Sequence, residues 1–178
     1  MTLGAPLADG VTLVLGGARS GKSRFAEGLI EASGRPAIYI ATAEAHDDEM
    51  RARISEHRDR RRDFWTTVDA PLALGKAIST HSTEGGVILV DCLTLWVTNL
   101  ILAEHDIAAA STSLASLLAG PLPCPVVLVS NEVGLGIVPD NAMARAFRDH
   151  AGRLHQSIAA IAERVVFVAA GLPLTLKG

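Results

Sequence analysis

The stretch VTLVLGGARSGKS, residues 11–23, decides the fold that this chain is expected to adopt. Its first five residues form an apolar run of the kind that builds a buried parallel strand. The next eight, GGARSGKS, match the pattern G-x-x-x-x-G-K-[S/T] without a mismatch. In a strand–turn–helix context, such a loop binds phosphate through its backbone N–H groups and the helix N-terminus. The alternative is a glycine-rich turn that only joins strand to helix, and the context favours the phosphate loop.

Each part of this loop has a chemical role. Lys22 would reach the β- and γ-phosphates of a nucleotide as a point charge, and the Ser23 hydroxyl would hold Mg²⁺. The residues expected to contact phosphates are Gly16, Gly17, Ala18, Arg19, Ser20, Gly21, Lys22 and Ser23.

Apolar runs of the same kind recur along the rest of the chain. They are rich in Val, Ile and Leu, and they span 37–41, 87–90, 126–129 and 165–169. Helix-compatible segments lie between them, at 22–32, 47–62, 92–104, 113–119 and 141–164. This alternation predicts an open, mostly parallel α/β sheet with helices on both faces. With the phosphate loop after its first strand, the chain is expected to have the core of a RecA-like P-loop NTPase. We expect one domain spanning residues 1–178.

Composition narrows the function classes. The chain has 178 residues, a net charge of −3 and only 4 % aromatic residues, which argues against nucleic-acid binding. Two cysteines, Cys92 and Cys124, are too few for a secreted disulfide framework, so a cytoplasmic protein is expected. The most apolar stretch, 87–103, is short for a bilayer and is interrupted by polar residues. It predicts a buried strand followed by an amphipathic helix, without stable membrane insertion.

Two further features follow predicted strands, at the sheet edge where α/β proteins bind ligands. Asp91 ends the run 87–90 and would hold Mg²⁺ directly or through water. It could also, or instead, cap the helix that begins near Cys92. The loop NEVGLGIVPD, residues 131–140, is a candidate for substrate contact, and a purely structural connection is equally open.

The segment 45–62 begins acidic and ends basic, as a helix favours. Met50, Ile54 and His57 follow helical spacing and place His57 on the apolar stripe, where a histidine is more often structural than catalytic. The arginines that follow could bind a triphosphate, and a neutral imidazole beside them could attack phosphorus. A solvated helix end accounts for some of these arginines equally well.

The other histidines are weaker candidates. His46 precedes the helix, and His81 is expected in a polar loop. His150 and His155 belong to the long C-terminal helix, where a surface position is the default expectation.

Taken together, these segments resemble the bifunctional adenosylcobinamide kinase / adenosylcobinamide-phosphate guanylyltransferase family of cobalamin biosynthesis, the CobU/CobP type. The phosphate loop alone is generic, whereas the His-Arg helix joined to NEVGLGIVP is specific. The resemblance rests on GGARSGKSRFAE (16–27), YIATA (39–43), DDEMRARISEHRDRR (47–61), WTTVD (65–69), LVDCLTLWVTNL (89–100), NEVGLGIVP (131–139) and ARAFRDHAGRLHQ (144–156).

The resemblance implies two reactions. A nucleoside triphosphate, ATP or GTP, phosphorylates the aminopropanol hydroxyl of adenosylcobinamide. A histidine, His57 by motif position, then takes GMP from GTP and passes it to adenosylcobinamide phosphate. The nucleotide site would add Ala41, Thr42, Ala43, Arg58, Asp59, Arg60, Arg61, Asp69 and Asp91 to the phosphate loop. The family also implies a homo-oligomer, with a trimer as the expected form.

The sequence departs from the family pattern in three places. Asp69 stands in place of Glu, His155 stands in place of Asn, and His46 is a rival nucleophile. Two other functions remain open from the residues: a simple P-loop kinase without a covalent intermediate, and a non-catalytic nucleotide-binding regulator.

Overall fold

The computed structural model describes residues 6–43 and 64–178. Its strands are β1 (Val11–Gly16), β2 (Ala37–Ala41), β3 (Trp65–Asp69), β4 (Val87–Asp91), β5 (Val126–Asn131), β6 (Arg164–Ala169) and β7 (Leu172–Lys177). Its helices are α1 (Lys22–Ser33), α3 (Leu74–His81), α4 (Leu93–Leu102), α5 (Ile107–Leu118) and α6 (Ala142–Ile161).

The strands form one seven-stranded sheet in the order β3-β2-β4-β5-β1-β6-β7. Every neighbouring pair is parallel except β6 and β7, which form an antiparallel hairpin at one edge. The predicted mostly parallel α/β sheet is therefore confirmed. Because the six parallel strands point the same way, their C-terminal ends meet at one edge of the sheet.

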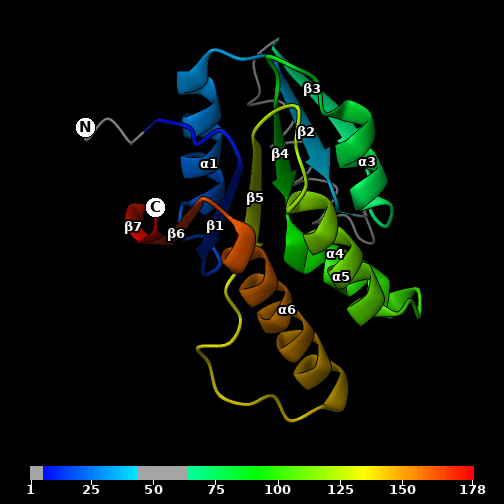
Figure 1. Cartoon of the computed structure of the whole chain (residues 1–178). Helices are drawn as coiled ribbons and strands as arrows, with labels where there is room; N and C mark the ends of the chain where they lie inside the picture. The colour runs from blue at the N-terminus through cyan, green and yellow to red at the C-terminus, as the bar shows by residue number, and fades with distance from the viewer. Residues whose placement is uncertain (1–5, 44–63) are drawn as a thin grey trace.

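Helices cover both faces of the sheet (Figure 1). Helix α1 lies on one face, and α3, α4, α5 and α6 lie on the other. Successive strand residues serve opposite faces, so in β1 Leu13 packs in the core beneath α3–α6 and Val14 in the core beneath α1. Burial on both faces is why these strands appear in the sequence as continuous apolar runs.

Three elements were not predicted. They are β3, α3 and β7, of which β7 is exposed along its whole length. His81 is the last residue of α3 rather than part of a polar loop.

Two helix boundaries also differ from the prediction. Helix α5 begins at Ile107 rather than near Ser113, because the Asp106 side chain accepts a hydrogen bond from the Ala109 N–H and caps it there. Helix α6 ends at Ile161, and Arg164 belongs to β6. The predicted helix 47–62 lies outside the described residues.

Helix α4 is buried around most of its circumference rather than amphipathic, because it packs against β5, α5 and α6. None of the described helices is long and apolar enough to cross a membrane.

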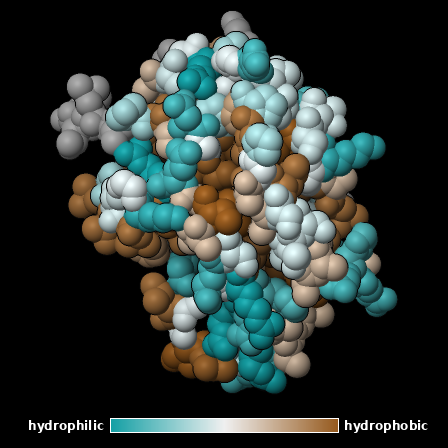
Figure 2. Space-filling view, viewed as in Figure 1, coloured by the Kyte–Doolittle hydropathy of each residue, from teal (hydrophilic) through white to brown (hydrophobic). Residues whose placement is uncertain are grey.

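Large apolar side chains are exposed in several places, two of which are β7 and the loop between β5 and α6 (Figure 2). In β7, Leu172, Leu174 and Leu176 are between 57 and 72 % exposed. In the loop between β5 and α6, Leu135 and Ile137 are 82 and 97 % exposed. No described part of the chain covers these side chains, so both are candidate contact surfaces.

A buried amide joins α4 to the ligand-binding edge of the sheet. The Asn99 Nδ2 group donates to the carbonyl oxygens of Thr42, at 2.7 Å, and Pro71, at 3.0 Å. Thr42 follows β2 and Pro71 follows β3, so one side chain ties two strand ends to the helix.

We predict that Asn99→Ala lowers the free energy of unfolding by about 2–3 kcal/mol, because two carbonyl oxygens lose their donor in the interior. Thr112→Ala is the control, since the Thr112 hydroxyl bonds a carbonyl on the exposed side of α5. The control should change the stability by less than about 0.5 kcal/mol. Urea unfolding measures both variants, and equal losses would contradict the assignment.

Candidate functional site

The loop from β1 to α1 has the backbone shape of a phosphate loop. Arg19 and the N-cap residue Gly21 have φ angles of 55° and 95°, so the chain turns through left-handed conformations just before the helix. A Cβ on Gly16 would lie 2.5 Å from both the Val168 carbonyl oxygen and the Ser20 Oγ atom. Glycine is therefore required at the first position of the motif by close approach and at the sixth by backbone conformation.

Carbonyl groups of this loop are tied to neighbouring parts of the molecule. The Gly16 oxygen accepts from the Glu132 N–H at 3.0 Å, and the Ser20 oxygen accepts from the Gly171 N–H at 2.7 Å. The Gly17 oxygen accepts from the Lys22 ammonium at 3.2 Å. The loop is thus held from outside by β5 and by the β6–β7 turn.

Asp91 is the last residue of β4 and is half-buried. Its Oδ2 atom accepts a hydrogen bond of 2.9 Å from the Tyr39 hydroxyl. Tyr39 belongs to the core cluster beneath α1, so the Asp91 carboxylate lies on the same face of the sheet as the phosphate-loop helix. The N-cap of α4 is Cys92, with no side-chain cap, so the alternative role of Asp91 as a helix cap is wrong.

The Cys92 thiol is influenced by two charged side chains of the candidate site, Asp91 and Lys22. Burial and the Asp91 carboxylate raise the pKa of its thiol to about 11, while the Thr94 hydrogen bond and the Lys22 ammonium act the other way. The phosphate-loop lysine and the β4 aspartate are therefore close enough to influence the same buried atom. The thiol itself is neutral at physiological pH.

A chain of buried polar groups links the ends of β2, β4 and β5. The Thr42 hydroxyl donates to the Cys92 carbonyl oxygen at 2.7 Å and accepts from the Cys92 N–H at 2.9 Å. The Thr94 hydroxyl contacts the Cys92 thiol at 3.2 Å and accepts from the Asn131 side-chain amide at 3.1 Å. These bonds fix the relative positions of three strand ends.

This network bears on the predicted nucleotide contacts of residues 41–43. Thr42 has no exposed surface, so in this structure it ties the backbone together rather than facing a ligand. Any contact of this segment with a nucleotide therefore falls to Ala41 and Ala43.

The loop after β5 is shaped by its own acidic residue. The Glu132 carboxylate accepts from the Gly134 N–H at 2.8 Å and from the Leu135 N–H at 3.1 Å. This local bonding gives Glu132 a structural role in the loop, while the Glu132 N–H holds Gly16. The loop and the phosphate loop are thereby joined at the backbone.

His155 is buried, contrary to the expected surface position. The residue is 8 % exposed, and its Nε2 atom lies 2.7 Å from the Ser130 hydroxyl at the end of β5. Burial lowers the pKa of His155, and the Glu132 carboxylate opposes this in part. The neutral imidazole therefore links α6 to the strand that carries Asn131.

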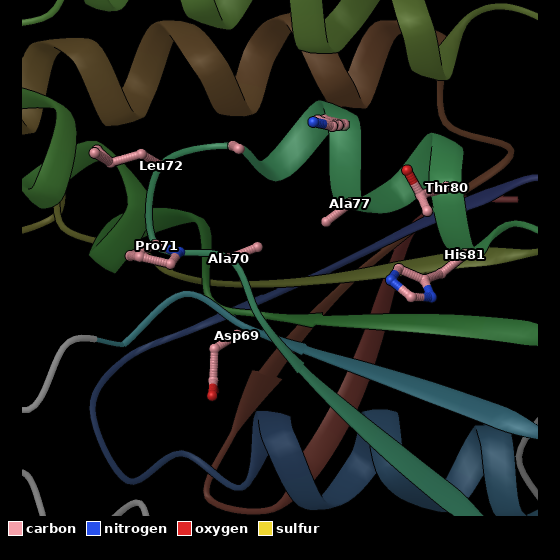
Figure 3. A pocket seen from close by; sticks show the side chains of 9 residues that line it. Asp69, Ala70, Pro71, Leu72, Ala77, Thr80 and His81 are labelled. Atoms are coloured by element: carbon pink, nitrogen blue, oxygen red, sulfur yellow. The ribbon is translucent and has the colours of Figure 1, made fainter.

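Asp69 lies at the rim of an open pocket between β3 and α3, with a volume of about 400 Å³ (Figure 3). Pro71, Leu72 and Ala77 line the pocket, and the Asp69 side chain points away from α3. In the strand register Asp69 and Asp91 are both paired with Ala41, from opposite sides of β2. Since neighbouring strands lie about 4.8 Å apart, the two aspartates sit two strand spacings apart on the same edge.

The structure thus places the phosphate loop, Asp91 and the end of β5 at one edge of the sheet, while Asp69 lies farther along the same edge, at the end of β3. The predicted site residues His57, Arg58, Asp59, Arg60 and Arg61, and the rival His46, lie outside the described residues. Two supporting residues, Tyr39 and Gly171, were not predicted from the sequence. Tyr39 is one residue of an apolar run, and nothing in the sequence marks it as a partner of Asp91. Gly171 lies in a turn after the last predicted strand, and no hairpin was predicted there.

Most of the chain matches a known protein family. Residues 12–176 match the family model described as cobinamide kinase / cobinamide phosphate guanyltransferase. The chain belongs to this family. Two nucleotide-dependent activities, phosphorylation and guanylyl transfer on cobinamide substrates, come with that membership.

Two relatives illustrate the similarity. The chain is 52 % identical to the bifunctional adenosylcobalamin biosynthesis protein CobP of Pseudomonas aeruginosa, covering 93 % of this chain and 96 % of the relative. It is 44 % identical to the bifunctional adenosylcobalamin biosynthesis protein CobU of Escherichia coli K12, covering 93 % and 98 %.

Solved structures confirm the RecA-like P-loop fold and nothing beyond it. A Pyrococcus horikoshii protein, PH0250, superposes with a TM-score of 0.57 at 8 % identity, covering 98 % of this chain and 88 % of that one. A solved ATPase domain gives a TM-score of 0.50 at 12 % identity, covering 89 % and 69 %. The P4 protein of bacteriophage phi6, solved with ADP, gives 0.50 at 17 % identity, and this chain spans 55 % of its length.

The buried imidazole generates a prediction about pH. Because burial holds the pKa of His155 below 6.5, the unfolded state binds more protons than the folded state once the pH falls below that value. The free energy of unfolding should therefore decrease as the pH falls from about 6.5, by at most about 1.4 kcal/mol per pH unit.

His155→Asn should remove the part of this pH dependence that comes from His155, while the new asparagine amide can still form a hydrogen bond with Ser130. His105→Asn, at an exposed position after α4, is the control and should keep the wild-type slope. Urea unfolding between pH 5 and 7 gives the free energy of unfolding of the wild type and both variants. If its dependence on pH were the same in His155→Asn as in the wild type, the prediction would be contradicted.

Proposed function

We propose that this chain phosphorylates the aminopropanol hydroxyl of adenosylcobinamide with ATP or GTP in adenosylcobalamin biosynthesis. It then transfers GMP from GTP to the product, which gives adenosylcobinamide-GDP. The observation that carries the proposal is the meeting of the phosphate loop with Asp91 at one sheet edge, in a chain of this family. One domain spanning residues 1–178 would carry both reactions.

In the kinase half, the backbone N–H groups of residues 16–23 and the Lys22 ammonium bind and orient the phosphates of the nucleotide donor. Lys22 donates to the Gly17 carbonyl oxygen in this structure, so its side chain already lies along the loop. Charge on the transferred phosphoryl group is then stabilised by fixed donors, which is how most phosphoryl-transfer sites work.

The residues fit a Mg²⁺ ion that is shared with the nucleotide. Asp91 is half-buried, and Tyr39 occupies only its Oδ2 atom, while Ser23 is the second residue of α1. The described residues contain no cluster of three or more metal-ligating side chains. A Mg²⁺ ion at a nucleotide site usually takes one or two protein ligands and completes its shell with phosphate oxygens and water. When bound, the ion would neutralise charge on the β- and γ-phosphates.

In the guanylyl-transfer half, we assign the nucleophile to His57, as the family motif implies. A neutral imidazole nitrogen attacks the α-phosphorus of GTP, a P–N bond forms, and the P–O bond to the β-phosphate breaks to release pyrophosphate. A phosphate oxygen of adenosylcobinamide phosphate then attacks the same phosphorus, the P–N bond breaks, and the histidine is regenerated. Arg58, Asp59, Arg60 and Arg61 would bind the nucleotide beside it, with Asp69 as a further contact.

We also propose that the protein works as a homo-oligomer, with a trimer as the expected form. The exposed apolar side chains of β7 and of the loop between β5 and α6 support association, because neighbouring exposed apolar side chains often mark contact surfaces.

The covalent step is tested by intact-mass measurement after incubation with GTP and Mg²⁺. The wild-type chain should gain one GMP moiety that brief acid treatment removes, and His57→Ala should gain none. Lys22→Ala should lose most of the adduct because the phosphates are no longer held. Normal GTP binding without any adduct would favour the simple kinase, and an adduct that persists in His57→Ala would indicate His46.

The metal role of Asp91 is tested by the Mg²⁺ requirement of the kinase reaction. Asp91→Asn should raise the Mg²⁺ concentration for half-maximal rate by about tenfold or more, because an amide oxygen is a far weaker ligand than a carboxylate. Asp149→Asn, on the exposed side of α6, is the matched control and should leave the requirement unchanged. Identical Mg²⁺ curves for both variants would remove Asp91 from the metal site.

A further inference from the structure

The turn between β6 and β7 lies directly against the phosphate loop. Ala169 and Leu172 are paired across the hairpin, so the turn consists of Ala170 and Gly171. Their φ angles are 51° and 78°, and two consecutive positive values are the signature of a tight type I′ hairpin turn. The Gly171 N–H donates to the Ser20 carbonyl oxygen at 2.7 Å.

The contact is close on both sides. A Cβ on Gly21 would lie 3.1 Å from the Gly171 Cα atom, and a Cβ on Gly16 would lie 2.5 Å from the Val168 carbonyl oxygen. The end of β6 and the tip of the hairpin therefore form the outer wall of the loop. In a two-residue hairpin turn, the N–H of the second turn residue has no partner within the turn. Without the Ser20 carbonyl oxygen, the Gly171 N–H would therefore face solvent.

This hydrogen bond fixes the direction of a donor inside the loop. The peptide between Ser20 and Gly21 is trans, so the Ser20 C=O and the Gly21 N–H point in opposite directions. Holding the carbonyl toward the hairpin therefore turns the Gly21 N–H away from the hairpin. The Glu132 N–H acts on the Gly16 carbonyl in the same way from the other side.

We propose that Gly171 is a positioning residue for the nucleotide-binding site: its N–H holds the Ser20–Gly21 peptide so that the Gly21 N–H is presented to a bound phosphate. The inference rests on the proposed function of the phosphate loop. By reciprocity, a nucleotide in the loop stabilises the hairpin tip by the same factor by which the hairpin tightens nucleotide binding.

The first test is amide hydrogen exchange measured by NMR on the full wild-type chain without nucleotide. The Gly171 N–H should be protected although its residue is exposed in a turn, and the protection should increase when GDP is added. Free exchange of this N–H in the absence of GDP would overturn the inference.

The second test uses three variants and the affinity for GDP. Gly171→Val places a β-branched residue at a positive φ angle, which shifts the turn and should weaken GDP binding by about tenfold, as expected when a donor to a charged group is misdirected. Gly171→Asn tolerates the left-handed conformation and should keep near-wild-type affinity. Gly85→Val is the matched control, because Gly85 has a φ angle of 77° and equally open surroundings. Gly85 precedes the N-terminal end of β4, so it lies at the sheet edge opposite the site.

The outcomes separate the two proposals. Loss of affinity in Gly171→Val, with normal affinity in Gly171→Asn and Gly85→Val, supports the positioning role even if both valine variants are less stable. Equal affinity of Gly171→Val and wild type, with Lys22→Ala unable to bind GDP, overturns this inference and leaves the proposed function intact. If the wild-type chain bound no GDP, the phosphate site would fall and this inference with it.

Discussion

The structure depends on the common direction of six strands, which brings their C-terminal ends to one edge of the sheet. Each strand end leaves backbone N–H and C=O groups without a ladder partner, and these groups must be satisfied where a site is also needed. In this chain they are satisfied by one another. Glu132 and Gly171 bond the phosphate loop, and Thr42, Cys92 and Asn99 bond the ends of β2 and β4. These bonds hold the described strand ends in place before any ligand arrives, which is the condition for electrostatic preorganisation.

The cost of this arrangement is a set of polar side chains buried beneath the site. Thr42, Thr94, Asn99, Ser130 and His155 are all less than a tenth exposed. Each has a hydrogen-bond partner among the described residues, so burial is offset rather than merely tolerated. The pairing makes the edge intolerant of small changes, because removing one partner leaves the other unsatisfied in a region of low dielectric.

The sequence predicted the strands that are buried on both faces, since those appear as uninterrupted apolar runs. Strand β3 was missed because Thr66, Thr67 and Asp69 are exposed on a sheet edge. Strand β7 was missed because its leucines alternate with other residues, so it lacks the continuous apolar run that identified the other strands. Its leucines face solvent. The end of α6 was misplaced because no glycine or proline marks the break before Arg164.

The site divides in the same way. The phosphate loop and Asp91 were predictable because a fixed backbone shape demands particular residues in a fixed order. His155 was misjudged although the signal was present: Ala151, His155 and Ile158 follow the helical spacing that placed His57 on an apolar stripe. Tyr39 and Gly171 were out of reach, because each acts through a partner distant in the chain, 52 residues away for Tyr39 and Asp91. Such pairs become visible only when the strand order is known.

The contact between the β6–β7 turn and the phosphate loop allows the exposed edge strand β7 to affect the nucleotide-binding site. Strand β7 packs no side chain into the described core, and it is attached to the sheet through its pairing with β6. Its turn nevertheless supplies a backbone donor to the phosphate loop. A backbone donor cannot be removed by most substitutions, but it can be displaced by anything that moves the strand. Binding of another molecule along β7 would therefore change nucleotide affinity only so far as it favours one position of the turn, and a ligand that left the turn unmoved would have no effect.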